Sequence, residues 1–520
     1  MNVLDERSRP LWLDDAPTIE APPLSAPAKT DTLVIGAGIA GLSVAYALAW
    51  RGRDVVVVDR GAIGRGMTAR TTAHLASELD DFYFKLAKRR GADDARAFAE
   101  SQKAAIASIE SIVRTENIAC DFVRVDGYLF GHTKSQNELL ENEFVAATAA
   151  GLEVAWAERA PMDGYDTGAC LRFARQARVH PLKYLVGLAG AIVARGGRIF
   201  ANSPVESVEE HDGGVVATFQ NGATIEAAHA VAAANTPFID RVAIHTKQAP
   251  YRTYAMAFEA SPGAVADALM WDTLDPYHYV RIQPRTGCDA VIVGGEDHKT
   301  GLADDAQMRF ANLEAWARAR YRGLGAMTHA WSGQVYEPVD YLPFIGRNPG
   351  HERVFVVTGD SGQGMTMGAT AGLIIPDLIE GRENSWCDLF RPARKSLASA
   401  AAYVSENKDV VANLAEYAAA KTKSSADEIA PGEGALLRDG LNIVAAYRAP
   451  SGELHLRSAS CTHIGCVVHW NSFETCWDCP CHGSQFSPEG EVLQGPAFKP
   501  LAEAEEAERP ARRDEDQPRL

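Results

Sequence analysis

The sequence predicts a doubly wound α/β domain with an inserted α+β subdomain, followed by a small all-β domain. From residue 31 onward, apolar strand-like runs alternate with helical patterns, which is the rhythm of a doubly wound sheet. Residues 251–295 resemble consecutive antiparallel strands, and residues 432–501 contain short strands separated by turn signals. With 520 residues, 46% of them hydrophobic, the chain exceeds what one ordinary domain holds.

The composition shifts at several points along the chain and predicts its division. An Ala- and Lys-rich stretch follows the α/β domain, and the last residues are strongly charged. We expect a flexible leader (1–30), the α/β domain (31–390) with its insertion at roughly 80–150 and 245–325, a helical linker (391–430), the all-β domain (431–503) and a disordered charged tail (504–520).

Charge and hydropathy exclude some classes of protein. The net charge of −17 and the pI of about 5.3 argue against a nucleic-acid partner, which needs clustered Lys and Arg. The N-terminus carries acids and prolines where a secretory signal has a basic start and an apolar run, so we expect a cytoplasmic location. Residues 32–50 are apolar, but their glycines and the strand that follows favour a buried strand and helix over a membrane span.

A glycine motif predicts a dinucleotide site in the α/β domain. Gly36, Gly38 and Gly41 follow the strand LVI directly and open a helix. Glycines at these positions permit a tight turn, let the backbone approach a pyrophosphate and let the helix pack on the strand, while the helix N-terminus attracts the phosphates. Asp59 ends the next strand, where it can accept hydrogen bonds from a ribose. A glycine turn without function is the alternative, and the motif alone does not separate FAD from NAD.

A family resemblance favours FAD. GRGMTARTTAHLAS (64–77), HPLKYLVGLA, AVAAANTP, VDYLPFIG and VFVVTGDSGQGMTMGATAGLIIPDLIEG follow each other as in the family of D-amino-acid oxidase, glycine oxidase and sarcosine oxidase. A solvated loop and a helix start used only for packing are the alternatives for 64–77 and 362–366. The resemblance implies that FAD also contacts Arg60, Thr68, Arg70, Thr71, Thr72, Val205, Asn235, Gly362, Gln363, Gly364, Met365 and Thr366.

The same resemblance implies an activity. In this family a carbon–nitrogen bond of an amino acid or amine is oxidised, and hydride passes to the flavin. Arg281 is the candidate clamp for a substrate carboxylate, with Tyr279 and His278 as further candidates. An exposed arginine between strands is the alternative for Arg281. No histidine or carboxylate stands out as an obligatory base.

Two boxes in the all-β domain predict an iron–sulfur cluster. CTHIGC (461–466) and CPCHGSQF (479–486) each place a cysteine and a histidine on a tight loop, as a [2Fe–2S] cluster with two thiolates and two imidazoles needs. We assign Cys461, His463, Cys479 and His482 as ligands. A zinc site that uses Cys476 and Cys479 is the alternative, but it leaves most of this spacing unexplained.

The boxes resemble those of respiratory and photosynthetic Rieske proteins. The resemblance implies a disulfide between Cys466 and Cys481, a cluster-bonding hydroxyl at Ser484 and a covering loop at 495–497. Phe486 stands where high-potential members have a tyrosine, so one hydrogen-bond donor is missing. We therefore expect a reduction potential in the middle or lower part of the range of roughly −150 to +300 mV.

Together the two cofactors predict a converter between two-electron and one-electron chemistry. In the first hypothesis the protein is a dehydrogenase: a small amine or amino acid reduces FAD, the cluster drains it, and an external one-electron acceptor protein completes the cycle. The combination also resembles a group of FAD-dependent oxidoreductases with a carboxy-terminal Rieske domain. In the second hypothesis electrons enter through the cluster, either for a flavin reductase or for a redox sensor. A non-catalytic redox-responsive binding protein is the third.

Overall fold

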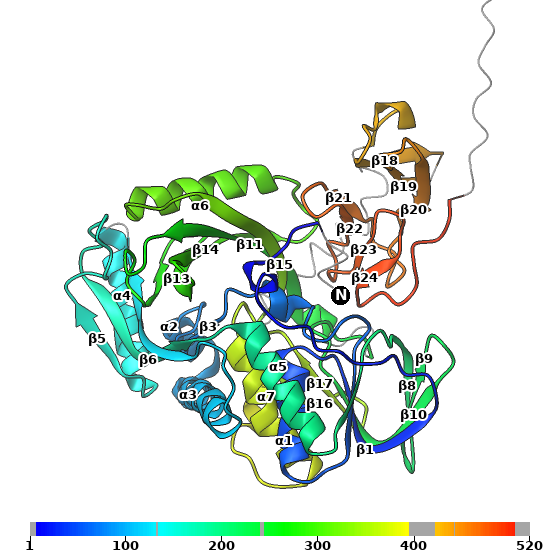
Figure 1. Ribbon diagram of the computed structural model, residues 1–520, viewed down its shortest axis with the longest axis horizontal. Coiled ribbons are helices and arrows are strands. Elements are labelled where there is room, and N and C mark those ends of the chain that lie inside the picture. The colour runs from blue at the N-terminus through cyan, green and yellow to red at the C-terminus, as the bar shows by residue number, and fades with distance from the viewer. Residues whose placement is uncertain (1–6, 132–133, 240–243, 395–421, 441, 505–520) are drawn as a thin grey trace, which may run out of the picture.

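The computed structural model describes residues 7–131, 134–239, 244–394, 422–440 and 442–504. Figure 1 shows two large sheets with helices packed on them, and a small β domain beside the second sheet. The predicted fold class is confirmed in each of its three parts.

The first sheet has a parallel centre, in the order β17, β10, β1, β2, β7. β2, β17 and the end of β1 are apolar runs that are buried on both faces, since helices or other elements cover this part of the sheet. β16 pairs antiparallel with β17, and a β8–β9 hairpin extends from β10. The strands are β1 (Ala28–Ile35), β2 (Val55–Val58), β7 (Arg198–Phe200), β8 (Val205–His211), β9 (Gly214–Phe219), β10 (Thr224–Ala232), β16 (Phe344–Arg347) and β17 (Val354–Thr358).

Helices α1, α5 and α7 pack beside one another against this sheet (Figure 1). α1 is apolar around most of its circumference and accordingly is buried between its neighbours. The helices are α1 (Ile39–Trp50), α2 (Tyr83–Arg90), α3 (Ala92–Thr115), α4 (Lys134–Ala149), α5 (Pro181–Ala194), α6 (Ala306–Arg320), α7 (Gly364–Ile379) and α8 (Cys387–Phe390).

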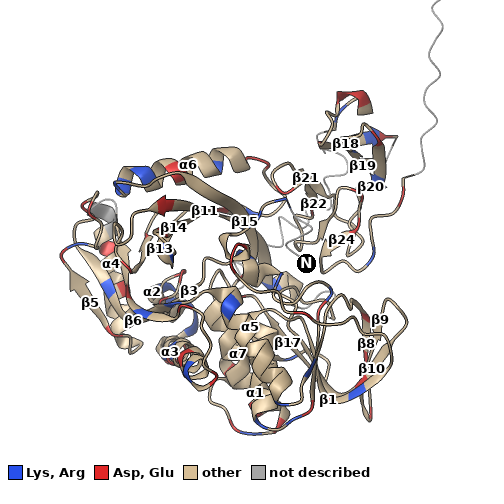
Figure 2. Ribbon diagram, in the orientation of Figure 1, with Lys and Arg blue, Asp and Glu red and all other residues tan. Residues whose placement is uncertain are grey.

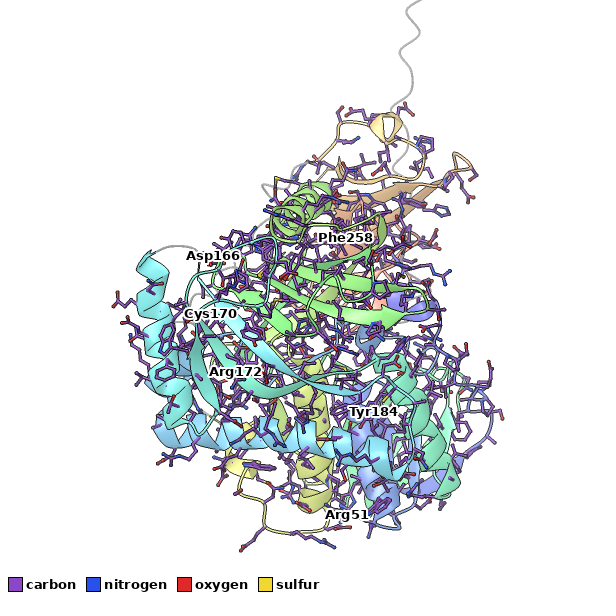
Figure 3. All side chains as sticks on the ribbon, turned by 60° about the vertical axis from the view of Figure 1, so that its left-hand side comes forward. Arg51, Asp166, Cys170, Arg172, Tyr184 and Phe258 are labelled. Atoms are coloured by element: carbon purple, nitrogen blue, oxygen red, sulfur yellow. A yellow bond between two sulfur atoms is a disulfide. The ribbon has the colours of Figure 1, made fainter. Side chains whose placement is uncertain are left out.

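The second sheet is mostly antiparallel and belongs to the inserted subdomain. Its order is β15, β11, β14, β13, β12, β4, β6, β3, with β5 beside β6. α6 packs on it: Phe258 of β11, labelled in Figure 3, is fully buried, and the Arg318 guanidinium lies 5.1 Å from its ring centre. The strands are β3 (His74–Leu75), β4 (Val123–Phe130), β5 (Val154–Ala157), β6 (Cys170–Arg178), β11 (Gln248–Ala260), β12 (Leu269–Asp272), β13 (His278–Arg285), β14 (Cys288–Lys299) and β15 (Met327–Pro338).

The insertion is larger than expected. Residues 80–150 are largely helical, as predicted, but they also contain β4, and the sheet takes β3, β5 and β6 from outside this range, between 74 and 178. The second part likewise reaches 338 instead of 325. The difference arises because short strands such as β3 are defined by their partners and not by a local pattern.

The flexible-leader prediction is wrong for the described residues 7–27. Leu11 and Trp12 are buried in a short 3-10 helix, η1 (Leu11–Leu13). The Trp12 indole donates a hydrogen bond to the Thr71 carbonyl at 2.6 Å. Tertiary packing of two apolar side chains therefore orders a segment whose local composition favours a loop.

The C-terminal β domain contains two small sheets, β18–β19–β20 and β21–β22–β23–β24. Most of the predicted linker (395–421) and nearly all of the predicted tail (505–520) lie outside the described residues. The remaining short 3-10 helices are η2 (Met67–Arg70), η3 (His245–Lys247) and η6 (Ala426–Glu428). The strands are β18 (Gly434–Asp439), β19 (Asn442–Arg448), β20 (Leu454–Ser458), β21 (His469–Asn471), β22 (Cys476–Asp478), β23 (Gln485–Phe486) and β24 (Val492–Gln494).

Basic and acidic residues are interspersed over the ribbon in Figure 2, without a basic stripe along the drawn segments that are described. Within these segments, none of the helices combines the length and apolar character that crossing a membrane requires.

Candidate active site and iron–sulfur centre

The glycine motif forms the turn between β1 and α1. Gly36 has a φ of +105°, and a Cβ atom there would lie 2.4 Å from the Ala233 carbonyl oxygen. A Cβ atom on Gly41 would lie 1.8 Å from the Gly36 carbonyl oxygen, so only glycine lets the helix approach the turn. The backbone therefore leaves an open cradle in front of the N-terminus of α1.

Asp59 and Thr68 hold this turn in place. The Asp59 carboxylate accepts hydrogen bonds from the backbone N–H groups of Ala37 (2.8 Å) and Gly61 (2.9 Å). The Thr68 hydroxyl accepts one from Ile39 N–H at 3.0 Å, in the first turn of α1. Both side chains also line the pocket in front of the turn, as a dinucleotide site requires.

This pocket brings together almost all of the residues predicted for FAD. Gly41 is the exception, because it is used for packing against Gly36. α7 begins at Gly364, which lines the pocket, so the positive end of this helix faces the pocket. The predicted residues in the lining are Gly36, Gly38, Asp59, Arg60, Thr68, Arg70, Thr71, Thr72, Val205, Asn235, Gly362, Gln363, Gly364, Met365 and Thr366. The open cradle and this lining fit FAD.

Arg70 lines the pocket, but its charged end belongs to the domain interface. The guanidinium forms a buried ion pair with Glu474 of the β domain at 3.0 Å and donates to the Ser332 carbonyl at 2.6 Å. These protein groups hold its charged end, and the predicted contact between Arg70 and FAD stays a prediction.

Arg281 is fully buried and is not among the pocket-lining residues. Its guanidinium donates to the carbonyls of Ala73 (2.8 Å) and Val179 (3.0 Å) and to the side chain of Gln283 (2.6 Å). The Trp12 ring covers it at 5.3 Å. A guanidinium with these partners stabilises the subdomain boundary, so Arg281 does not serve as the expected carboxylate clamp, nor is it an exposed arginine.

Tyr279 and His278, the two further candidates for contact with the substrate, lie in different places. Tyr279 lines the pocket, and its hydroxyl lies 3.3 Å from that of Thr253. His278 lies outside the pocket lining, hydrogen-bonded to Asp272 (3.2 Å) and Glu296 (3.3 Å) and stacked on Trp316. Successive residues of a strand face opposite sides of the sheet, which explains why only one of them reaches the pocket.

Sequence reasoning missed a group of acids in the same pocket. Glu78, Asp80 and Asp297 line it, as does Asp360 beside the start of α7. Burial, together with the charge of Asp81, raises the pKa of Asp80 to about 7, and burial raises the pKa of Asp297 to about 6. No motif marks these acids, because they are brought together from different loops and strands.

The iron–sulfur boxes lie on two adjacent loops of the β domain. The thiols of Cys461 and Cys479 are buried and interact with each other, and the rings of His463 and His482 lie 5.1 Å apart. Both ring nitrogens of His482 are buried without a hydrogen-bond partner among the described residues. Burial lowers the pKa of His482 to about 3, so its imidazole is in the neutral form that ligates metal. Two thiols beside two imidazoles fit a [2Fe–2S] cluster.

The expected disulfide between Cys466 and Cys481 is present. The sulfurs of Cys466, Cys479 and Cys481 lie within 4.8 Å of one another, but the disulfide leaves only Cys479 of the three as a ligand. The thiol of Cys476, which the zinc alternative would use, contacts the Asp478 carboxylate at 3.6 Å. The disulfide therefore joins the two loops, as the resemblance implied.

The cluster loops lie against the flavin pocket. Tyr336 donates a hydrogen bond to the His482 carbonyl (3.1 Å), and the Gln334 amide donates to the Gly483 carbonyl (2.9 Å). His245 packs with its ring 4.8 Å from that of His463 and 5.1 Å from that of His482. Part of the pocket wall also comes from the β domain, through Gln494, Gly495, Ala497 and Phe498.

Comparisons with known proteins agree with this geometry. A model of the FAD dependent oxidoreductase family matches residues 31–378, and a model of the Rieske [2Fe-2S] domain matches residues 420–505. The Rieske 2Fe-2S iron-sulfur protein YhfW of Bacillus subtilis is 31% identical over 94% of this chain and 96% of its own length. Gamma-glutamylputrescine oxidoreductase of Escherichia coli is 26% identical over 69% of this chain and 85% of its own. The crystal structure of glycine oxidase from Geobacillus kaustophilus superposes with a TM-score of 0.57 at 17% identity, covering 71% of this chain and 99% of that one.

The fold and the two sites define a flavoprotein that also carries an iron–sulfur centre. The chain belongs to the FAD dependent oxidoreductase family, and a Rieske domain follows its flavin domain. Its cofactors are FAD and a [2Fe–2S] cluster, as the sequence predicted.

Proposed function

We propose that the protein oxidises a carbon–nitrogen bond of an amine or amino acid and passes the electrons from FAD through the Rieske cluster to an external acceptor. The observation that carries this proposal is the shared wall: Gln494, Gly495 and Ala497, beside the cluster loops, line the flavin pocket. Relatives named for glycine and gamma-glutamylputrescine oxidation support the type of bond.

Each cofactor has its own set of residues. The cradle at Gly36 and Gly38, with Asp59, would hold the dinucleotide part of FAD, and the segment 362–366 would follow the flavin ring. Cys461, Cys479, His463 and His482 would hold the cluster. When bound, FAD accepts hydride from the carbon next to nitrogen, and the cluster takes up one electron at a time.

A hydrogen-bonded path joins the pocket to the cluster loop. Thr236, which lines the pocket, donates to the Tyr336 hydroxyl at 2.9 Å, and Tyr336 donates to the carbonyl of His482. Gln494 donates to the Thr236 hydroxyl at 3.3 Å. All four side chains are buried, so this contact also excludes water between the two redox sites.

Anaerobic absorbance and EPR spectroscopy on the purified protein test the proposal. A panel of amines and amino acids is added, with dithionite as the control for a reducible cluster. We expect one class of amine to bleach the flavin, followed by the EPR signal of a reduced Rieske cluster. Flavin that responds to no compound, beside a cluster that dithionite reduces, would contradict the dehydrogenase and favour an external reductase.

A cluster-free variant separates the two halves of the reaction. In Cys461→Ser the amine should still bleach the flavin, while the EPR signal disappears. In Tyr336→Phe, which loses the hydrogen bond to the His482 carbonyl, the EPR signal should appear more slowly after bleaching. An EPR signal of unchanged rate in Tyr336→Phe would exclude this path.

A further inference from the structure

The flavin pocket continues beneath the second sheet into an acidic chamber. We define the acidic chamber by the pocket-lining residues that surround Asp80. Strands β11, β12 and β14 contribute to it, together with the loop before β13 and β13 itself, and a Cβ atom on Gly362 would lie 2.7 Å from the Asp80 carboxylate. The chamber therefore adjoins the segment proposed to follow the flavin ring. Its residues are Glu78, Asp80, Thr253, Trp271, Tyr277, Tyr279 and Asp297.

The chamber combines carboxylates with aromatic rings. Tyr277 donates a hydrogen bond to the Asp80 carboxylate at 3.1 Å, and the rings of Tyr277 and Tyr279 lie 5.5 Å apart. Three carboxyl groups face one cavity, and each of them that is ionised repels an anionic guest. Carboxylates beside aromatic faces are the arrangement that binds an organic cation.

The basic side chains near the chamber do not neutralise its acids, because they bind other groups of the protein or are uncharged. Among the described residues that line the pocket, Arg70 is paired with Glu474, and Arg60 donates to the Leu493 carbonyl at 3.5 Å. Burial lowers the pKa of His74 to about 3, so this third group is neutral. Arg309, whose charge acts on Asp297, is bound to Asp305 and to a backbone carbonyl.

An unpartnered polar atom gives independent evidence for a ligand. Glu78 and Trp271 are only 2% and 7% exposed and hydrogen-bond to each other, so their polar groups are satisfied within the chamber. Gln363 is 8% exposed and lines the pocket beside Glu78, to whose carbonyl its amide donates, but its Oε1 atom has no hydrogen-bond partner among the described residues. A buried polar atom is costly unless it is satisfied, so the Gln363 oxygen indicates that a polar guest completes the site.

We propose that the substrate is a cationic amine, of the diamine type, without a carboxylate next to the reacting carbon. Its positive end lies between Asp80 and Asp297 and against the rings of Tyr277 and Tyr279. This inference rests on the proposed function and specifies its substrate class. It also explains why no arginine clamp faces the chamber: a carboxylate would meet three acids and no available cation among the described lining residues.

Ligand binding to the oxidised holoenzyme tests the proposal without turnover. The probe is benzyltrimethylammonium chloride, which has no nitrogen lone pair and cannot be oxidised at the carbon–nitrogen bond. Benzoate serves as the anion of similar shape, and Mg²⁺ at matched ionic strength tests for a metal site. We expect benzyltrimethylammonium to give a saturable change in the flavin spectrum, and benzoate and Mg²⁺ to give none.

Single substitutions test whether benzyltrimethylammonium binds in the acidic chamber. Asp80→Asn and Asp297→Asn should each weaken benzyltrimethylammonium binding by about tenfold or more, which corresponds to about 1.4 kcal/mol. Asp163→Asn, on the exposed surface, is the matched control and should bind as the unmodified protein does. Flavin content is measured for each variant. If a variant loses FAD, the comparison of benzyltrimethylammonium, benzoate and Mg²⁺ on the unmodified protein still shows whether the site prefers an organic cation.

The outcomes separate this inference from the proposed function. Benzoate or Mg²⁺ binding in place of the cation, or variants that bind the cation normally, would overturn the cationic substrate. Such a result leaves amine-driven bleaching of the flavin untouched. Conversely, a protein that binds the cation but whose flavin no amine bleaches would overturn the proposed oxidation and leave the cation site standing.

Discussion

At the scale of single residues, burial and neighbouring charge set the state of the chamber acids. Asp80 lies beside Asp81 and Asp297, and the pKa of Asp80 is raised to about 7, first by burial and then by these charges. The pKa of Glu78 is raised well above its usual value by burial and by the charges of Asp80 and Glu143. Tyr277 opposes the shift, since its hydroxyl donates to Asp80.

The raised pKa values of Asp80 and Asp297 predict that the affinity of the chamber for a cation depends on pH. A carboxyl group binds a cation in its ionised form, so affinity is present above the pKa and is lost as the pH falls through it. We expect benzyltrimethylammonium affinity to rise between pH 5 and pH 8, as Asp297 and then Asp80 ionise. Titrations followed by the flavin spectrum, at constant ionic strength, measure this affinity at each pH. An affinity that falls over this interval would contradict the assignment. The other titratable and charged groups that face these acids are Glu78, Asp81, Tyr277, Tyr279, His74, His278, Glu296 and Arg309.

Phe486 gives a second prediction at this scale. It is fully buried in the same core cluster as Cys461 and Cys479, and it offers no hydrogen-bond donor. Phe486→Tyr should raise the reduction potential, because a donor near the cluster sulfurs stabilises the added electron. A redox titration followed by EPR measures the shift, and Tyr447→Phe, on β19 of the other small sheet, is the control. A lower or unchanged potential in Phe486→Tyr would remove this argument.

At the scale of elements, strands β11 and β15 of the second sheet and the short helix η2 hold the Rieske domain. Arg252 of β11 forms a buried ion pair with Asp478 of β22 at 2.9 Å, and Arg70 pairs with Glu474. Asn471 and Gln485 also donate to Asp478, so its charge is fully compensated. Arg70 and Arg252 keep the pKa of Glu474 below its usual value although burial acts to raise it. Figure 1 shows β21–β24 beside the ends of β11 and β15.

Breaking the ion pair between Arg252 and Asp478 should weaken the attachment of the Rieske domain to the flavin domain. Asp478→Leu leaves the Arg252 guanidinium buried without its partner, which costs about 3–5 kcal/mol. We expect a lower denaturation midpoint and slower appearance of the reduced cluster after flavin bleaching. The double variant Arg252→Met/Asp478→Leu removes both charges and should recover most of the stability. Equal stability of the single variant and the unmodified protein would show that the pair does not hold the domains.

At the scale of the whole molecule, the N-terminal segment joins the two domains. Ser8 donates to Glu474 of the Rieske domain at 2.6 Å and accepts a hydrogen bond from Arg70 at 2.9 Å, while Trp12 packs within the flavin domain. The segment lies between the two domains in Figure 1. It therefore contributes to the relative position of flavin and cluster.

Trp12→Ala tests this role. The side chain is fully buried, and its loss should destabilise the protein by about 3–5 kcal/mol. We expect a lower melting temperature and slower electron transfer to the cluster, measured by calorimetry and by stopped-flow absorbance. Trp50→Ala is the control, because Trp50 is 54% exposed. If Trp12→Ala changes neither quantity, the segment has no part in joining the domains.

The fold class and both cofactors could be predicted from the sequence and its family resemblance, and nearly all of the residues predicted to contact FAD line the pocket. These features depend on local patterns: the glycine turn at 36–41 needs particular backbone angles, and the spacing of Cys461, His463, Cys479 and His482 is dictated by the cluster. The three-dimensional structure was needed to show that the guanidinium groups of Arg281 and Arg70 bind protein groups, that residues 7–27 are packed, and that acids from separate segments meet in one chamber. A side chain's role there depends on its partners, and partners distant in sequence leave no local pattern.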